Sequence, residues 1–398
     1  MTGSGSVCEF LAGWHCQPLQ RCSNIIFDKA LKYKSNNPNI GSYLITIVGP
    51  AVFGLAESLF HAPMKIWLPM IQGGSGADNF AHRLASALQR HGVKAQITWF
   101  PTYFQFAPFL LSWTRPPPGT DIIHALSWSG FAFQRKDIPL VVTEQLDVLD
   151  PRYRPYKGFA QNAYHQTLIR AFVKASFKAA HAITAVSRAT ADSLRNILGP
   201  REIHIIYNSV DTRVFYPQPR NRERNMPMRL LFVGNLTRRK GADLLALIMK
   251  KLGPRFELRF TAGLRNLKLR DSEPNMVPIG KLVGDQSLLN AYHETDALLF
   301  PSRIEGLPIA PLEAMACGKP VIAARTSSLP EVLENQVCGF LCSLDDIDSF
   351  ASACRILADP VTLRAFGDAA RRRAEILFSE DVVIPKYITL YKNLLSRY

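Results

Sequence analysis

The sequence predicts an α/β protein built on parallel sheets. From residue 64 onward, short apolar runs alternate with amphipathic segments of helical periodicity, which is typical of parallel strands joined by helical crossovers. A chain of 398 residues is long enough for two such domains with full cores. Its 47% hydrophobic and 20% charged residues are typical of a globular protein. We therefore expect two parallel-sheet domains after residue 64.

The stretch from Phe300 to Arg325 predicts a strand end, a tight loop, a short helix and a second strand. An apolar run that ends at Phe300 indicates a buried strand, and Pro311 suits the first turn of a helix. Gly318 is placed to end that helix in left-handed backbone before a strand at 321–324. The loop and helix N-terminus therefore follow the carboxyl end of a strand, where anions bind.

Two carboxylates, Glu305 and Glu313, bracket this helix N-terminus with seven residues between them. Alone, Glu313 would be an ordinary acidic residue near a helix N-terminus, which the helix dipole favours. Two carboxylates beside an anion site can instead accept hydrogen bonds from sugar or ribose hydroxyls. The pair is the principal candidate for a ligand-binding site.

These residues resemble the donor-binding signature of the retaining glycosyltransferases of family 4. The resemblance rests on Glu305 with Gly306-Leu307-Pro308 after it, and on Glu313 with Ala314-Met315-Ala316-Cys317-Gly318-Lys319-Pro320-Val321 after it. It covers roughly residue 64 to the C-terminus. It implies the GT-B architecture, in which two Rossmann-like parallel-sheet domains face a cleft.

The resemblance also implies a hexosyltransferase and roles for particular residues. The donor would be a nucleoside-diphosphate sugar, and the acceptor a saccharide such as a growing surface polysaccharide, a lipid-linked saccharide or a small molecule. Glu305 would bind a hydroxyl of the donor sugar and Glu313 the ribose hydroxyls, with contacts from the Gly306 and Leu307 amides. The family reaction is described as same-face attack, in which the departing phosphate takes the acceptor proton and no side chain acts as a nucleophile.

Three cations stand on the loop after the expected strand at 228–233. Arg238, Arg239 and Lys240 precede a predicted helix at 242–252 and could neutralise a diphosphate. Lys240 matches a lysine of the family, whereas Asn235 stands where relatives carry an arginine. Either Arg238 or Arg239 would then supply that charge. The alternative is that all three are solvated loop charges.

A glycine-rich loop follows the first expected strand. Gly73, Gly74 and Gly76 match the family's loop, whose amides approach the donor diphosphate in the cleft, although a simple strand-to-helix turn is the alternative. The loop is not a dinucleotide fingerprint, because Asn79 stands at the third glycine position. An NAD-dependent enzyme is therefore disfavoured.

Three further residues are expected at strand ends in the first domain. His124 is predicted to be the last residue of a strand at 121–124, at the sheet edge where open α/β sheets bind ligands. The family often has a histidine here, on the acceptor side, although a lone histidine can be purely structural. Glu144 and Gln145, at the end of a strand from residue 139, are expected to face the same cleft.

Gly280 and Lys281 follow a predicted strand at 277–279, where the family's backbone reads the nucleobase, but they do not reveal which base. The string Asp345-Asp346-Ile347-Asp348 is expected to cap a helix at 349–358 rather than to hold a metal. We therefore expect no metal and no other cofactor, with cations stabilising the departing diphosphate.

Residues 1–63 differ in composition from the rest and are expected to form a poorly ordered N-terminal extension. An acceptor-binding domain at 64–217 and a nucleotide-sugar-binding domain at 218–378 should follow, joined by a linker rich in proline and charge within 216–228. Residues 379–398 should form a C-terminal helix that crosses back to the first domain. The run Arg371-Arg372-Arg373 is expected to be a solvated helix face.

The cysteines and the net charge bear on location. Seven cysteines, an odd number without zinc-ligand spacing, indicate a reducing compartment and therefore a cytoplasmic protein. The net charge of +15 would favour the inner face of an anionic membrane if it clusters on one face, and would mean only solubility if scattered. Nucleic acid is not an expected partner. Alternatives to the enzyme are a non-catalytic nucleotide-sugar-binding or membrane-surface adaptor, or a GT-B nucleotide-sugar epimerase.

Overall fold

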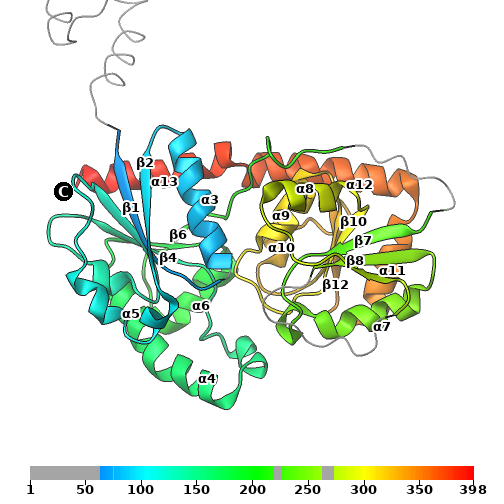
Figure 1. Cartoon of the computed structure of the whole chain (residues 1–398), viewed down its shortest axis with the longest axis horizontal. Coiled ribbons are helices and arrows are strands. Elements are labelled where there is room, and N and C mark those ends of the chain that lie inside the picture. Colours follow the sequence, from blue (N-terminus) through cyan, green and yellow to red (C-terminus); the bar gives the residue numbers. More distant parts are fainter. Residues whose placement is uncertain (1–62, 75, 219–225, 262–272) are drawn as a thin grey trace, which may run out of the picture. The chain divides into compact units, whose positions relative to one another are not determined.

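Two six-stranded sheets, parallel throughout, form the framework of the protein (Figure 1). The computed structural model describes residues 63–74, 76–218, 226–261 and 273–398. Each sheet carries helices on its faces, as parallel sheets require when both faces are buried. The predicted fold class is confirmed.

The first sheet has the strand order β2-β1-β3-β4-β5-β6, so its direction of winding reverses between β1 and β3. Its strands are β1 (Lys65–Ile71), β2 (Lys94–Phe100), β3 (Ile122–Leu126), β4 (Leu140–Glu144), β5 (Ala182–Ala185) and β6 (His204–Ile205). The α-helices of this part are α3 (Gly76–Arg90), α4 (Phe159–Tyr164), α5 (Arg170–Ala179) and α6 (Arg188–Leu198). Short 3-10 or π segments are η1 (Thr102–Gln105), η2 (Pro108–Trp113), η3 (Gly130–Phe133), η4 (Pro151–Tyr156) and η5 (His165–Ile169).

The second sheet has the order β12-β11-β10-β7-β8-β9, which is the 3-2-1-4-5-6 pattern of dinucleotide-binding folds. Its strands are β7 (Met228–Phe232), β8 (Phe256–Phe260), β9 (Met276–Pro278), β10 (Ala297–Phe300), β11 (Val321–Ala324) and β12 (Gly339–Cys342). The helical segments are η6 (Arg238–Lys240), α7 (Ala242–Leu252), α8 (Asp285–His293), α9 (Ile309–Ala316), α10 (Leu329–Val332), α11 (Ile347–Leu357), α12 (Pro360–Arg373), η7 (Ala374–Phe378) and α13 (Glu380–Leu395). Winding reverses between β7 and β10, so a ligand is expected at their carboxyl ends.

Alternation along the strands divides the core of the second sheet into two layers. Leu230 and Leu299 pack on the side of α7 and α11, whereas Leu231 and Leu298 pack on the side of α9. Both layers are closed to solvent, which explains why these strands are apolar runs rather than alternating patterns.

The C-terminal helix α13, red in Figure 1, packs on the first sheet. Val383, Ile384 and Tyr391 share a core cluster with Ile66 of β1 and Leu84 of α3. This packing explains the apolar spacing of the C-terminal segment.

Several sequence-based boundaries agree with the structure. Helix α6 begins after Ser187, whose hydroxyl accepts from the Thr190 amide at 3.0 Å. Asp346 caps α11 by accepting from the amides of Asp348 and Ser349, as expected for the acidic string. Gly318 has φ +67°, the left-handed conformation expected after α9. Cys338 and Cys342 are buried thiols.

The prediction that the arginine run is a solvated face is wrong for two of its three members. Arg371 donates to the carbonyl oxygens of Phe215 and Ala316 at 2.8 and 2.6 Å, and Arg373 donates to that of Val332 at 2.8 Å. Only Arg372 is exposed. These guanidinium groups bind carbonyl oxygens at the ends of buried segments, so they stabilise packing.

Residues 64–398 form one compact unit. The proposed division at residues 217 and 378 stays a prediction. The expected extension at 1–63 lies, apart from its last residue, outside the described residues, as does most of the expected linker, at 219–225. No helix among the described residues has the length and apolar character needed to cross a bilayer.

Candidate active site

The loops that follow β7 and β10 meet at the winding reversal of the second sheet. Gly241 has φ +72°, and a Cβ added there would lie 2.2 Å from the Pro301 carbonyl oxygen, so only glycine fits. The Arg303 amide donates to the Arg239 carbonyl oxygen at 2.8 Å, and the Arg303 side chain holds Asp243 at 2.7 and 2.9 Å. The cationic loop is therefore fixed against the loop that carries Glu305.

Glu305 is a buried carboxylate surrounded by donors. Its Oε1 atom lies 2.5 Å from Lys240 Nζ and 3.2 Å from Arg239 Nη1, and it accepts a hydrogen bond from the Ser302 hydroxyl. Burial alone would raise the pKa of Glu305, but Lys240 and Arg239 together lower it to about 2. The group is therefore ionised at neutral pH, and none of these contacts uses Oε2.

The two cations beside Glu305 are themselves largely buried. Burial lowers the pKa of Lys240, which Glu305 partly offsets, and the ammonium group lies 5.2 Å from the centre of the Phe300 ring. Arg239 donates to the Ile304 carbonyl oxygen at 2.7 Å and lies over the Tyr153 ring. Both cations are anchored, so the charge that they present to a ligand has a defined position.

Arg238 is placed differently. Its side chain is 72% exposed, and its Nε atom lies 4.0 Å from Asp243. Of the two arginines that could compensate for Asn235, only Arg239 lies beside Glu305. The structure therefore favours Arg239 for that role.

Glu313, on α9, is buried between two donors. Tyr292 donates to its Oε2 atom at 2.7 Å, and Arg83 of α3 donates to its Oε1 atom. Burial lowers the pKa of Arg83, but Glu313 and Asp285 reverse the effect, so the pKa is raised. Glu305 and Glu313 thus lie on one loop-and-helix segment, Glu305 with two adjacent cations and Glu313 with one.

The residues between the two glutamates contact the first-sheet part of the chain. A Cβ added to Gly306 would lie 1.6 Å from the Gln145 carbonyl oxygen, so glycine is the only residue that permits this approach. Leu307 is buried, and its carbonyl oxygen accepts from Asn208 Nδ2 at 2.8 Å. Gln145, expected in the cleft from topology, therefore does lie against the loop of the predicted donor site.

Glu144 ends β4 next to Gln145 and is buried. Burial, reinforced by Asp147, raises the pKa of Glu144 to about 8. The carboxyl group is therefore mostly protonated at neutral pH and can donate a hydrogen bond.

The glycine-rich loop after β1 is closed by its own helix. The Gly73 and Gly74 amides donate to the Asp78 carboxylate, at 3.0 and 2.8 Å respectively. Gly74 has φ +60°, and Gly76 is the first residue of α3. The amides that were expected to approach a diphosphate are thus paired with a carboxylate in this structure.

Gly280 and Lys281 both lie exposed after β9. Gly280 has φ +71°, and a Cβ there would meet no atom within 4 Å. No described contact joins either residue to Glu305 or Glu313, and their proposed role at the base stays a prediction.

The expected position of His124 is wrong. Strand β3 continues to Leu126, so His124 lies in mid-strand and is fully buried under α13. Its Nδ1 and Nε2 atoms each lie 2.6 Å from a hydroxyl, of Tyr391 and Thr143 respectively. Burial lowers its pKa to about 3. A side chain with no exposed surface and two occupied nitrogens is a structural histidine in this conformation.

This burial predicts an acid-sensitive fold. Unfolded His124 takes up a proton below about pH 6.5, whereas the folded residue stays neutral down to about pH 3, so stability is full above pH 6.5 and is lost as pH falls. The loss should reach up to about 1.4 kcal/mol per pH unit. Urea unfolding at pH 7 and pH 5 should show a smaller difference for His124→Gln than for the wild type.

The half-buried His204 of β6 supplies a matched substitution outside the core, and His204→Gln is measured alongside. Folded His124→Gln should also retain turnover at neutral pH. Loss of turnover in fully folded protein would restore a role in catalysis for His124.

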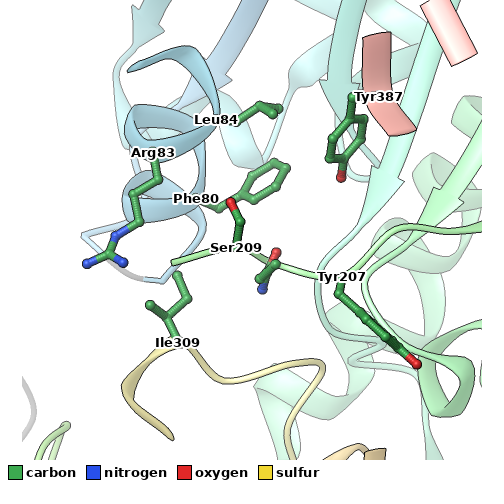
Figure 2. A pocket seen from close by; sticks show the side chains of 8 residues that line it. Phe80, Arg83, Leu84, Tyr207, Ser209, Ile309 and Tyr387 are labelled. Carbon is green, nitrogen blue, oxygen red and sulfur yellow. The ribbon is translucent and has the colours of Figure 1, made fainter. Parts of the chain in front are cut away.

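A small pocket is lined in part by Arg83, the partner of Glu313 (Figure 2). Its lining comes from α3, from the segment after β6, from the start of α9 and from α13: Phe80, Arg83, Leu84, Tyr207, Asn208, Ser209, Ile309 and Tyr387. Two buried polar atoms nearby, Asn208 Oδ1 and Gln145 Nε2, have no hydrogen-bond partner among the described residues. Buried polar atoms of this kind are usually satisfied, so a polar ligand would find partners here.

Sequence reasoning missed Arg83, Tyr292 and Ser302. Arg83 lies 230 residues from Glu313, and nothing in the local sequence marks it. The only available signal was its place on the first helix after a glycine-rich loop, where open α/β sheets bind ligands.

Comparison with known proteins finds two family models and several curated relatives. The family model for "Glycosyltransferase Family 4" matches residues 98–214, and the model for "Glycosyl transferases group 1" matches residues 227–359. Alpha-maltose-1-phosphate synthase of Mycobacterium tuberculosis is 27% identical over 311 residues, which cover 68% of this chain and 79% of that protein. The MMP alpha-(1->4)-mannosyltransferase of Mycolicibacterium hassiacum is 27% identical over 306 residues, covering 70% of this chain and 71% of the relative.

Solved structures share the fold. Sucrose-phosphate synthase from Thermosynechococcus elongatus has a TM-score of 0.72 at 21% identity and covers 84% of this chain and 100% of its own. Anabaena HepE, solved with UDP and glucose, has a TM-score of 0.65 at 18% identity, covering 83% and 100%.

Two parallel sheets, each with one reversal of strand order, and the likeness to these solved structures define the GT-B fold. The chain belongs to glycosyltransferase family 4, within the group 1 glycosyl transferases.

Proposed function

We propose that this enzyme transfers a hexose from a nucleoside-diphosphate sugar to a saccharide, lipid-linked or small-molecule acceptor, with retention of anomeric configuration. The observation that carries the proposal is the ionised Glu305 between Lys240 and Arg239 at the winding reversal of the second sheet. Such a group can accept hydrogen bonds from sugar hydroxyls while adjacent cations receive a phosphate.

The cations can serve the diphosphate without leaving Glu305. An ammonium group has three N–H donors and a guanidinium group has five, whereas Glu305 uses only part of each set. Because both groups are buried and anchored, they would stabilise charge that develops on the departing phosphate without reorganising. This supports departure of the diphosphate without a bound metal.

Glu313 is suited to ribose. Tyr292 fixes the orientation of the carboxylate, and two carboxylate oxygens offer about four acceptor positions, of which two are occupied by Tyr292 and Arg83. The remaining positions can accept from the two hydroxyls of a ribose. The unsatisfied Asn208 and Gln145 atoms nearby offer further partners for the sugar or the acceptor.

The relatives support the donor class. Anabaena HepE was solved with UDP and with UDP-glucose, and several relatives are named as enzymes that transfer sugars. We infer the same kind of donor for this chain.

The test is transfer from a panel of nucleoside-diphosphate sugars, followed by NMR of the anomeric proton of the product. Retention is expected, with turnover unchanged by excess chelator because Lys240 and Arg239 act in place of a metal. An inverted product, or turnover that chelator abolishes and magnesium restores, would contradict the proposed chemistry. Binding without turnover would favour an adaptor, and conversion of the donor without an acceptor would favour an epimerase.

A further inference from the structure

Two long segments of the first-sheet part contain no acidic residue. No aspartate or glutamate occurs between Asp78 and Asp121, or between Asp150 and Asp192. The second segment nevertheless contains seven lysines and arginines: Arg152, Arg154, Lys157, Arg170, Lys174, Lys178 and Arg188. The positive net charge is therefore concentrated in part of the chain rather than evenly scattered.

The two acid-free segments pack together. The Tyr164 hydroxyl of α4 donates to the Gln105 carbonyl oxygen of η1 at 2.8 Å. The Phe106 ring lies 5.4 Å from the Tyr164 ring. The parts that pack together follow the carboxyl ends of β2 and β4. The segment η4, which precedes α4, contacts the cationic loop, because the Arg239 guanidinium group lies over the Tyr153 ring. The packed parts therefore lie at the carboxyl edge of the first sheet, and η4 joins this edge to the active-site loop of the second sheet.

Large apolar side chains are exposed on this paired structure. Trp113 is 79% exposed and Phe159 is 92% exposed. Four others in η1, η2 and the turn between them expose 45–65% of their surface: Tyr103, Phe106, Phe109 and Leu110. We call these six residues the aromatic surface. Exposed apolar residues that gather in two packed segments, rather than being scattered singly, indicate a contact surface.

Cations occupy the helical run that continues from α4. Arg170, Lys174 and Lys178 recur every fourth residue on α5, so they form one exposed stripe. None of them makes an ion pair with another described residue, and Arg154 before α4 makes none either. Their charge is thus available to an external anion.

We propose that the aromatic surface and the α5 stripe dock the enzyme on an anionic lipid bilayer. Tryptophan, tyrosine and phenylalanine suit the boundary between headgroups and acyl chains, and each lysine or arginine near the surface adds attraction to anionic lipid. A polyanionic glycan would explain the stripe but not six exposed apolar residues. Docking at this edge would bring the active site next to a lipid-linked acceptor, and only this consequence rests on the proposed function.

The test uses the full chain and vesicles of phosphatidylcholine, with or without phosphatidylserine. Wild-type protein should co-sediment with the anionic vesicles, weakly with the neutral ones, and less as salt rises. The variant Phe109→Ser/Trp113→Ser, and separately Arg170→Gln/Lys174→Gln, should each weaken binding by about tenfold or more. The control Leu247→Ser/Val361→Ser removes exposed apolar residues of the second-sheet part and should bind like the wild type.

Trp113 provides a direct probe of insertion. Brominated acyl chains should quench tryptophan fluorescence of the wild type, and most of that quenching should vanish in Trp113→Phe. Equal binding to anionic and neutral vesicles would overturn the inference. Binding and quenching that stay unchanged in the aromatic variants would also overturn it, and would favour a polyanionic partner. The wild type and all variants contain residues 1–62, so a difference in vesicle binding between them does not come from that segment. Vesicle binding needs no sugar donor, so an inactive protein that docks would refute the proposed function alone.

Discussion

Glu305→Gln is expected to lower kcat by about ten- to a hundredfold, since one charged hydrogen bond in a partly dehydrated site contributes roughly 1.5–3 kcal/mol. The substitution keeps the shape of the side chain and a hydrogen bond from Ser302. In the proposed role of Glu305, it removes a negative charge beside the donor sugar, where positive charge develops at the anomeric carbon. Binding of the nucleoside diphosphate should be kept or tightened, because Lys240 and Arg239 lose their competing partner.

Glu313→Ala should have the opposite signature. In the proposed role, Glu313 binds the ribose in both the ground state and the transition state, so the variant should raise the donor KM more than it lowers kcat. It also leaves Arg83 without a carboxylate partner at that position, although Asp285 lies 3.5 Å away. Isothermal titration with the nucleoside diphosphate, combined with steady-state kinetics on folded protein, separates the two variants.

Wild-type binding and turnover in both folded variants would refute the assigned roles. In that case the two glutamates would serve only stability, as buried members of ion pairs. Because breaking a buried pair can cost about 3–5 kcal/mol, circular dichroism and urea unfolding must accompany the kinetics.

The fold was predictable because both sheets bury their strands on two faces. Runs such as the one ending at Phe300 are apolar throughout, and helix boundaries carry local chemistry, as Ser187 and Gly318 show. These signals act within a few residues, so a single sequence contains them. The resemblance to the family added the roles proposed for Glu305 and Glu313, which no local rule supplies.

His124 shows where local reasoning fails. The polar residue after two isoleucines predicts a strand that ends at His124. The structure satisfies the His124 imidazole with Tyr391, 267 residues later in the chain, and with Thr143. Arg83 was missed for a similar reason. Its partner Glu313 lies 230 residues away in the sequence, and nothing in the sequence of helix α3 indicates the pairing. Neither contact could be inferred without knowing how the chain closes on itself.

Gly306→Ala is expected to cost about 3 kcal/mol or more and to abolish most transfer. The new Cβ would lie 1.6 Å from the Gln145 carbonyl oxygen, and backbone cannot move aside as a flexible side chain can. The loop must therefore separate from Gln145, which displaces Glu305 on one side and Leu307 on the other. The temperature of thermal unfolding and the turnover should both fall, whereas the buried sheets should keep the wild-type circular dichroism.

Gly158→Ala is the matched control, because its added Cβ meets no atom within 4 Å and its φ of −70° suits alanine. If Gly306→Ala kept wild-type stability and turnover, the close approach of the Glu305 loop to Gln145 would not be part of the active enzyme.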